Sequence, residues 1–276
     1  MLKRWSPTLA RTTTVCAILF CIALVGLLVD HREITGAPAW LKPAKFGASG
    51  VVYLFSLAFM ARDIPRSRLL SVSTNLIGWI LVYEIVVIDI QAVRGTTSHF
   101  NVDSALNTKI YSSMGLGIAT VWVMSMVLLR LYWKTPAADR SMALAMRVGL
   151  ALNILGAGVG WTMTAPRADQ LAAIHRGVRP YLNGQHTVGA PDGGPGMPIT
   201  RWSRDHGDLR APHFLGMHAL QLLPLLLIGL RRVRTSRDDP VERSVIQFAA
   251  TLCAAIFIAA LLQALAGHPF IPPPTG

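Results

Sequence analysis

The residues of this chain that could do chemistry are histidines and carboxylates lying within or beside apolar segments. Two carboxylates, Glu84 and Asp89, interrupt one apolar run, and two histidines, His213 and His218, interrupt another. An ionisable group in hydrocarbon costs at least about 2.5–3.5 kcal/mol on insertion scales, so it normally faces a partner or a water-filled cavity. These four side chains are therefore the first candidates for a site.

The depths of these residues suggest how they meet. At a rise of 1.5 Å per residue, Asp89 lies about 7 Å below the end of its segment and His218 about 9 Å below the end of its own. The similar depths predict that the two segments pack side by side and that Asp89 and His218 share a hydrogen bond, a metal ion or a water. His99 and His213 would complete a metal site, since imidazole and carboxylate ligands suit zinc, iron or copper. A haem held by these histidines is a less favoured prediction.

Two further residues complete the candidate catalytic set with Asp89. Glu84 lies about 15 Å below the boundary, near the midplane, where it could relay protons. Arg210, at the start of the segment that carries the histidines, could hold an anionic group. Glu84 and Asp89 are about 140° apart on an ideal helix, so they cannot form a simple bidentate grip.

The elements that must position these residues are membrane spans. Hydrophobic residues make up 52% of the chain and charged residues only 14%, against roughly 25% in a soluble domain, and the mean hydropathy is +0.45. Apolar runs suited to a hydrocarbon core of about 30 Å recur along the chain. The sequence thus predicts an all-α polytopic bundle, a single domain over 1–276, with seven spans at about 13–29, 46–61, 69–93, 110–131, 146–164, 212–230 and 245–267.

Orientation follows from the lysines and arginines, which are concentrated in short loops on one side. This places the amino terminus in the cytoplasm and the carboxyl terminus outside, with a long extracytoplasmic loop at 165–211 and another at 30–46 that contains Lys42 and Lys45. All eight histidines then lie toward the outside: His31, His99, His175, His186, His206, His213, His218 and His268. The net charge of +12 is spread over several loops, which excludes a nucleic-acid interface and predicts contact with anionic headgroups.

The first span also has the basic start and apolar run of a signal peptide, although the candidate cleavage site at 37–39 is too far downstream. The sequence leaves open whether this span is removed. Gly156 and Gly160, with Gly149 and Asn153 along a similar stripe, predict close helix packing. The run from Gly189 to Gly196 predicts consecutive turns. The long loop that contains it could act as a lid over the outer mouth.

Several familiar sites are excluded by the sequence. The last span has no lysine for a retinal Schiff base, and the chain has no HExxH zinc motif, no GxSxG elbow and no Walker loop.

Four strings carry a resemblance to a known family: WLKPAKF (40–46), RGTTSHFN (94–101), HTVGAPDGGPG (186–196) and GDLRAPHFLGMHALQ (207–221). Together they resemble a family of bacterial polytopic membrane proteins without an assigned activity, and the resemblance extends over nearly the whole chain. It implies a location in the bacterial inner membrane. It implies no catalytic residues.

Three functions fit these observations. The leading hypothesis is a metal-binding or redox membrane enzyme that acts on a small-molecule substrate at the extracytoplasmic face, although the residues do not decide whether the chain is an enzyme. The alternative is a proton-coupled small-molecule transporter that uses Glu84 and Asp89. A third hypothesis is a non-catalytic assembly or docking partner of another membrane protein. The oligomeric state cannot be read from the residues.

Overall fold

The computed structural model describes residues 6–233 and 240–271 and is 70% helical. Seven of them are long and apolar enough to cross a membrane, which confirms the predicted all-α bundle. They are α1 (Pro7–Val29), α2 (Leu41–Ala61), α3 (Arg68–Val93), α4 (Ala105–Lys134), α5 (Arg140–Thr162), α7 (Arg210–Val233) and α8 (Pro240–Leu265). The eighth helix, α6 (Ala168–His175), is short and lies in the long loop.

Side-chain caps set the starts of several helices. The hydroxyls of Ser67 and Ser104 accept hydrogen bonds from backbone N–H groups in the first turns of α3 and α4, at 3.1 and 3.2 Å. Asp139 caps α5 in the same way, through Met142 N at 2.9 Å. Each of these residues satisfies a donor that the helix itself cannot satisfy.

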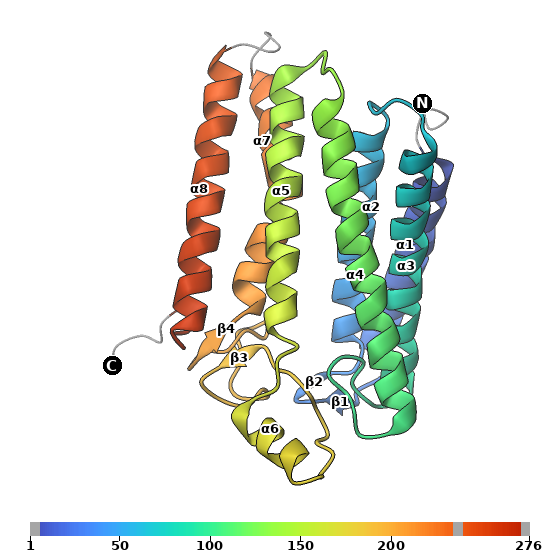
Figure 1. Cartoon of the computed structure of the whole chain (residues 1–276), viewed down its shortest axis with the longest axis vertical. Helices are drawn as coiled ribbons and strands as arrows, with labels where there is room; N and C mark the ends of the chain where they lie inside the picture. Colours follow the sequence, from blue (N-terminus) through green and yellow to red (C-terminus); the bar gives the residue numbers. More distant parts are fainter. Residues whose placement is uncertain (1–5, 234–239, 272–276) are drawn as a thin grey trace.

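The bundle has two different ends (Figure 1). One end carries residues 30–40, 94–104 and 163–209 and is called the loop end here. It contains α6 and two short antiparallel two-stranded sheets, β1 (Glu33–Ile34) with β2 (Ala37–Pro38) and β3 (Thr187–Val188) with β4 (Gly207–Asp208). The opposite end, called the arginine end, carries the short basic connections. Helix α1 begins at the arginine end and α8 finishes at the loop end, as an odd number of spans requires (Figure 1).

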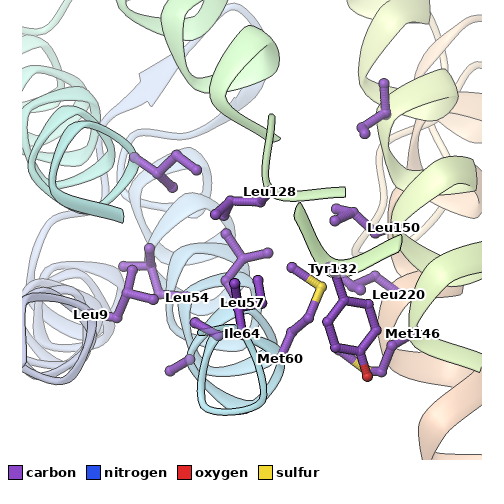
Figure 2. Close-up of a cluster of buried hydrophobic side chains, with 14 of the residues drawn as sticks. Leu9, Leu54, Leu57, Met60, Ile64, Leu128, Tyr132, Met146, Leu150 and Leu220 are labelled. Atoms are coloured by element: carbon purple, nitrogen blue, oxygen red, sulfur yellow. The ribbon is translucent and has the colours of Figure 1, made fainter. Parts of the chain in front are cut away.

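The helices form two groups. Helices α1 to α4 pack on one another, with α1 against α2 and α3 against α4, while α5, α7 and α8 form the second group. The groups meet where α4 contacts α5 and where α2 contacts α7. Side chains from α2, α4, α5 and α7 form the core between the groups (Figure 2), including Leu57, Leu128, Leu150 and Leu220.

The contact between α5 and α7 is close because both helices have glycines there. A Cβ atom at Gly156 would lie 2.6 Å from the nitrogen of Met217 and 2.7 Å from Cα of Gly216. Asn153 on α5 donates a hydrogen bond of 2.8 Å to the carbonyl of Met217. The close packing expected from the glycine stripe of this span is therefore confirmed.

One expected boundary is wrong in a way that changes the site. Helix α2 begins at Leu41 and not near residue 46, so Lys42 and Lys45 lie in its first turns and not in a loop. Pro43 explains the early start, because a proline is tolerated in the first turn of a helix, where its missing N–H is not needed.

Candidate functional site at the loop end

The two carboxylates of α3 are buried. Glu84 is 2% exposed and Asp89 is 9% exposed, and none of their four carboxylate oxygens has a hydrogen-bond partner among the described residues. Glu84 points toward α4, where a Cβ at Gly117 would lie 2.8 Å from its Oε1 atom. Buried and unpaired carboxyl groups are costly, so both positions are candidates for function.

The histidines of α7 make local contacts. Nδ1 of His213 donates a hydrogen bond to the carbonyl oxygen of Gly156 at 2.8 Å, which joins α7 to α5. Nδ1 of His218 lies 3.1 Å from Oε1 of Gln221, and its ring packs on Phe214 with 4.2 Å between the ring centroids. Each ring therefore has a structural partner through its Nδ1 atom.

His99 lies in the connection between α3 and α4, in an aromatic environment. Its ring centroid is 5.6 Å from that of Phe46, and its Nδ1 atom is 3.0 Å from the hydroxyl of Ser98. Burial lowers the pKa of His99 well below its ordinary value, and the positive charges of Lys42 and His186 lower it further. His99 is therefore a neutral imidazole at physiological pH.

The four predicted metal ligands do not form a ligand group in this structure. Over residues 6–233 and 240–271, no three His, Cys, Asp or Glu side chains are placed to hold one ion together. The expected packing of α3 against α7 is also wrong, because α2 contacts both helices while α3 packs on α1, α2 and α4. Asp89 and His218 have similar depths but belong to helices that do not pack along one another. Depth along a helix does not determine which neighbour a side chain faces.

The structure instead brings four basic side chains together. We call Lys42 and Lys45 of α2, Arg201 of the long loop and Arg210 of α7 the cationic cluster. Arg210 lies within electrostatic range of both lysines, and Arg201 within range of Lys45. The cluster thus combines residues from both helix groups at the loop end.

Neutral carbonyl oxygens accept most of the cluster's hydrogen bonds. Nζ of Lys45 donates to the carbonyl of Thr200 at 3.1 Å, and Nη2 of Arg210 donates to the carbonyl of Arg201 at 2.6 Å. Arg201 itself donates to the carbonyl of Gly36 in the β1–β2 hairpin. The carboxylate of Asp208 pairs with Arg210, at 2.6 Å. The Arg210 side chain, which the sequence predicted to hold an anion, therefore already has Asp208 and a carbonyl oxygen as hydrogen-bond partners.

Lys42 connects the cluster to the midplane. Its ammonium group lies within electrostatic range of Arg210 on one side and of Glu84 on the other. The Nζ atom is 5.8 Å from the centroid of the Phe46 ring, a distance that allows a cation–π attraction. Lys42 is therefore within electrostatic range of both the cationic cluster and a buried carboxyl group.

The long loop is folded by its own polar contacts. Asp192 accepts a hydrogen bond from Thr187 N at 2.8 Å, and its Oδ2 atom lies 2.8 Å from Nδ1 of His186. Burial raises the pKa of Asp192, but the bonds from His186 and Thr187 and the charge of His186 outweigh it and hold that pKa well below its ordinary value. The positive φ angles of Gly189 and Gly193 fit the expected turns.

The sequence analysis named Glu84 and Arg210 as candidate site residues but not Lys42 and Lys45. The signal was present in the string WLKPAKF, where the proline marks a first helical turn and the two lysines, three residues apart, share a face.

No protein-family model, curated protein or solved structure matches the chain.

Proposed function

We propose that this chain is a proton-coupled membrane carrier for a small anionic solute, which binds at the cationic cluster while Glu84 carries the proton. The observation that supports this most directly is the position of Lys42, within electrostatic range of both Arg210 and Glu84. The resemblance noted in the sequence supports a bacterial inner membrane, and the basic loops support a loop end that faces outward.

The charges of the cluster favour an anion. Four basic side chains gather there, and Lys45 and Arg201 donate to carbonyl oxygens. An anionic acceptor adds the Coulomb attraction of opposite charges, which a neutral carbonyl oxygen does not offer. A carboxylate or phosphate group that replaced these carbonyls would gain stronger contacts with the same donors.

Glu84 supplies a reason for proton coupling. Lys42 can be balanced by an ionised Glu84 or by a bound anion. If the anion takes Lys42, an ionised Glu84 is left without a partner in an apolar environment, which favours its protonation. Anion binding and proton uptake then occur together.

The two helix groups supply a mechanism for movement. Lys42 and Lys45 belong to the α1–α4 group and Arg210 to the other group. An anion held by both would change the preferred arrangement of one group relative to the other. The metal-enzyme hypothesis has less support, because the described residues contain no three-ligand group.

The test is transport in liposomes that contain the purified full chain and a pH-sensitive dye. Succinate, lactate and inorganic phosphate gradients are applied in turn, and at least one is expected to drive proton uptake. Lys42→Ala is expected to abolish anion binding and uptake, and Lys42→Arg to retain part of both. Glu84→Gln is expected to bind the anion without moving protons.

Asp89→Asn is the matched control, because Asp89 is also a buried carboxylate of α3. The carrier proposal is wrong if Asp89→Asn stops proton uptake as completely as Glu84→Gln. It is also wrong if none of the anions binds and the purified protein instead contains a transition metal that is lost in His99→Ala.

A further inference from the structure

A cavity of about 990 Å³ lies at the arginine end, on the side of the bundle opposite the cationic cluster. Its walls come from the last turns of α2, α4 and α7, the connection between α4 and α5, and the start of α5. This volume is at the upper end of the range for small-molecule sites and is much larger than an inorganic ion requires.

One wall of this cavity is fixed by ion pairs. Arg231 of α7 contacts Asp139 at 2.5 Å and Glu242 of α8 at 2.7 Å, and the Glu242 side chain is fully buried. These contacts join the end of α7 and the start of α8 to the start of α5. The charge of Arg231 is therefore already matched within the protein.

Two other arginines line the cavity with more freedom to bind. The guanidinium carbon of Arg62 lies 3.8 Å from the centroid of the Phe59 ring, which places the group over an apolar surface. Its ion pair with Asp63 is 3.3 Å long and exposed to solvent, so it contributes little. Arg232, on the α7 side of the cavity, is exposed. Arg62 and Arg232 can therefore exchange present contacts for an anionic group.

Besides the ion-paired carboxylates of Asp63 and Asp139, the cavity has an apolar wall, and it lies at the depth of the membrane interface. Phe59, Met142 and Ile228 line the cavity together with Tyr132. Trp133, the next residue after Tyr132, is 57% exposed, and exposed tryptophans of membrane proteins gather at the interface. The site thus combines cationic groups with an apolar wall at headgroup level.

We propose that this cavity binds the phosphate-bearing headgroup of an anionic phospholipid, with Arg62 and Arg232 at the phosphate and the first acyl carbons along Phe59 and Ile228. The lipid belongs to the leaflet at the arginine end, which the basic loops predict to be cytoplasmic. Basic pockets between spans on that side suit such headgroups. The proposal is independent of the carrier function, because it uses none of the residues of the cationic cluster.

The test is native mass spectrometry of the purified, delipidated full chain titrated with phosphatidylglycerol and, in parallel, with phosphatidylcholine. Phosphatidylglycerol is expected to bind more tightly. Arg62→Ala and Arg232→Ala are each expected to weaken that binding about fivefold, the effect of removing one arginine near an anionic surface. Arg66→Ala is the matched control, because Arg66 is also exposed and belongs to the same connection as Arg62 but does not line the cavity.

Inorganic phosphate provides the second arm of the experiment. If it binds the delipidated protein and Arg62→Ala weakens this binding, while phosphatidylglycerol shows no preference over phosphatidylcholine, the site takes soluble phosphate and the lipid assignment is wrong. The assignment is also wrong if Arg66→Ala weakens lipid binding as much as Arg62→Ala. Melting temperatures of all three variants within a few degrees of the parent would show that a loss of binding is not a loss of fold.

Discussion

The imidazole of His213 joins α7 to α5 through a hydrogen bond of 2.8 Å from its Nδ1 atom to the carbonyl oxygen of Gly156. The glycine allows this contact, because Gly156 lies where the backbones of the two helices approach most closely. We therefore expect His213→Ala to destabilise the protein by about 1 kcal/mol, since it removes this hydrogen bond between the two helices. Thermal unfolding in detergent would measure this. Anion transport by the surviving folded fraction should be retained, and a selective loss of transport at unchanged stability would contradict this structural role.

The close contact of α5 and α7 also predicts that Gly156→Ala destabilises the protein. Gly156→Ala would place a methyl group 2.6–2.7 Å from the backbone of α7, so the helices must separate. We expect a loss of at least about 2 kcal/mol, the range seen when a well-packed core is overfilled. Gly115→Ala in α4 is the control, because nothing lies within 4 Å of its added Cβ, and it should leave stability unchanged or raise it by up to about 1 kcal/mol. Equal melting temperatures of the two variants would contradict the close packing.

The long loop should depend on the charge of Asp192. The pKa of Asp192 is lowered in the folded protein. Its contribution to folding stability is therefore present above the unfolded pKa of about 4 and is lost as the pH falls through the folded pKa. Asp192→Asn should increase amide hydrogen exchange over residues 186–192 at neutral pH, with a local loss of about 1–3 kcal/mol. Asp205→Asn is the control, because Asp205 is exposed in the same loop. Unchanged exchange in Asp192→Asn would rule out this role.

His99 should make stability fall on mild acidification. Its pKa is lowered in the folded state, so below the unfolded value of about 6.5 the unfolded chain binds a proton that the folded chain does not. Stability then falls by up to about 1.4 kcal/mol for each pH unit below that value. His99→Phe, which keeps an aromatic ring beside Phe46, should lose less stability between pH 7 and pH 5 than the parent. Parallel pH profiles of the two proteins would contradict a neutral His99.

Replacing Ile199 with glycine should relieve backbone strain in the long loop. Ile199 has a φ of 63°, a left-handed conformation that a β-branched residue adopts only at a cost, and its side chain is 80% exposed. Ile199→Gly should relieve about 1–2 kcal/mol of this strain and lower hydrogen exchange over residues 197–202. Ile199→Ala is the control and should keep most of the strain, since alanine also has a Cβ. Faster exchange in the glycine variant would contradict this prediction, because it would mean that the added backbone freedom of glycine destabilises the loop more than the relief of strain stabilises it.

The sequence by itself determined the class of fold and the number of spans. A helix that crosses the hydrocarbon core of a membrane needs about 20 apolar residues, and its backbone groups must hydrogen-bond within the helix because no water is present. Long apolar runs in the sequence therefore predict spanning helices. The glycine stripe of α5 also predicted its close contact with α7, because only small residues allow backbones to approach so closely.

Only the tertiary structure decided which polar groups meet. The expected partnership of Asp89 and His218 rested on depth, whereas in the structure α3 packs on α1, α2 and α4, and the Asp89 carboxylate has no hydrogen-bond partner among the described residues. The association of Lys42 with Arg210 and Glu84 required the start of α2 and the order of helices around the bundle. A sequence determines how deep a side chain lies along its own helix. The neighbour it faces depends on rotation and packing of whole helices, which the combined contacts of the bundle determine.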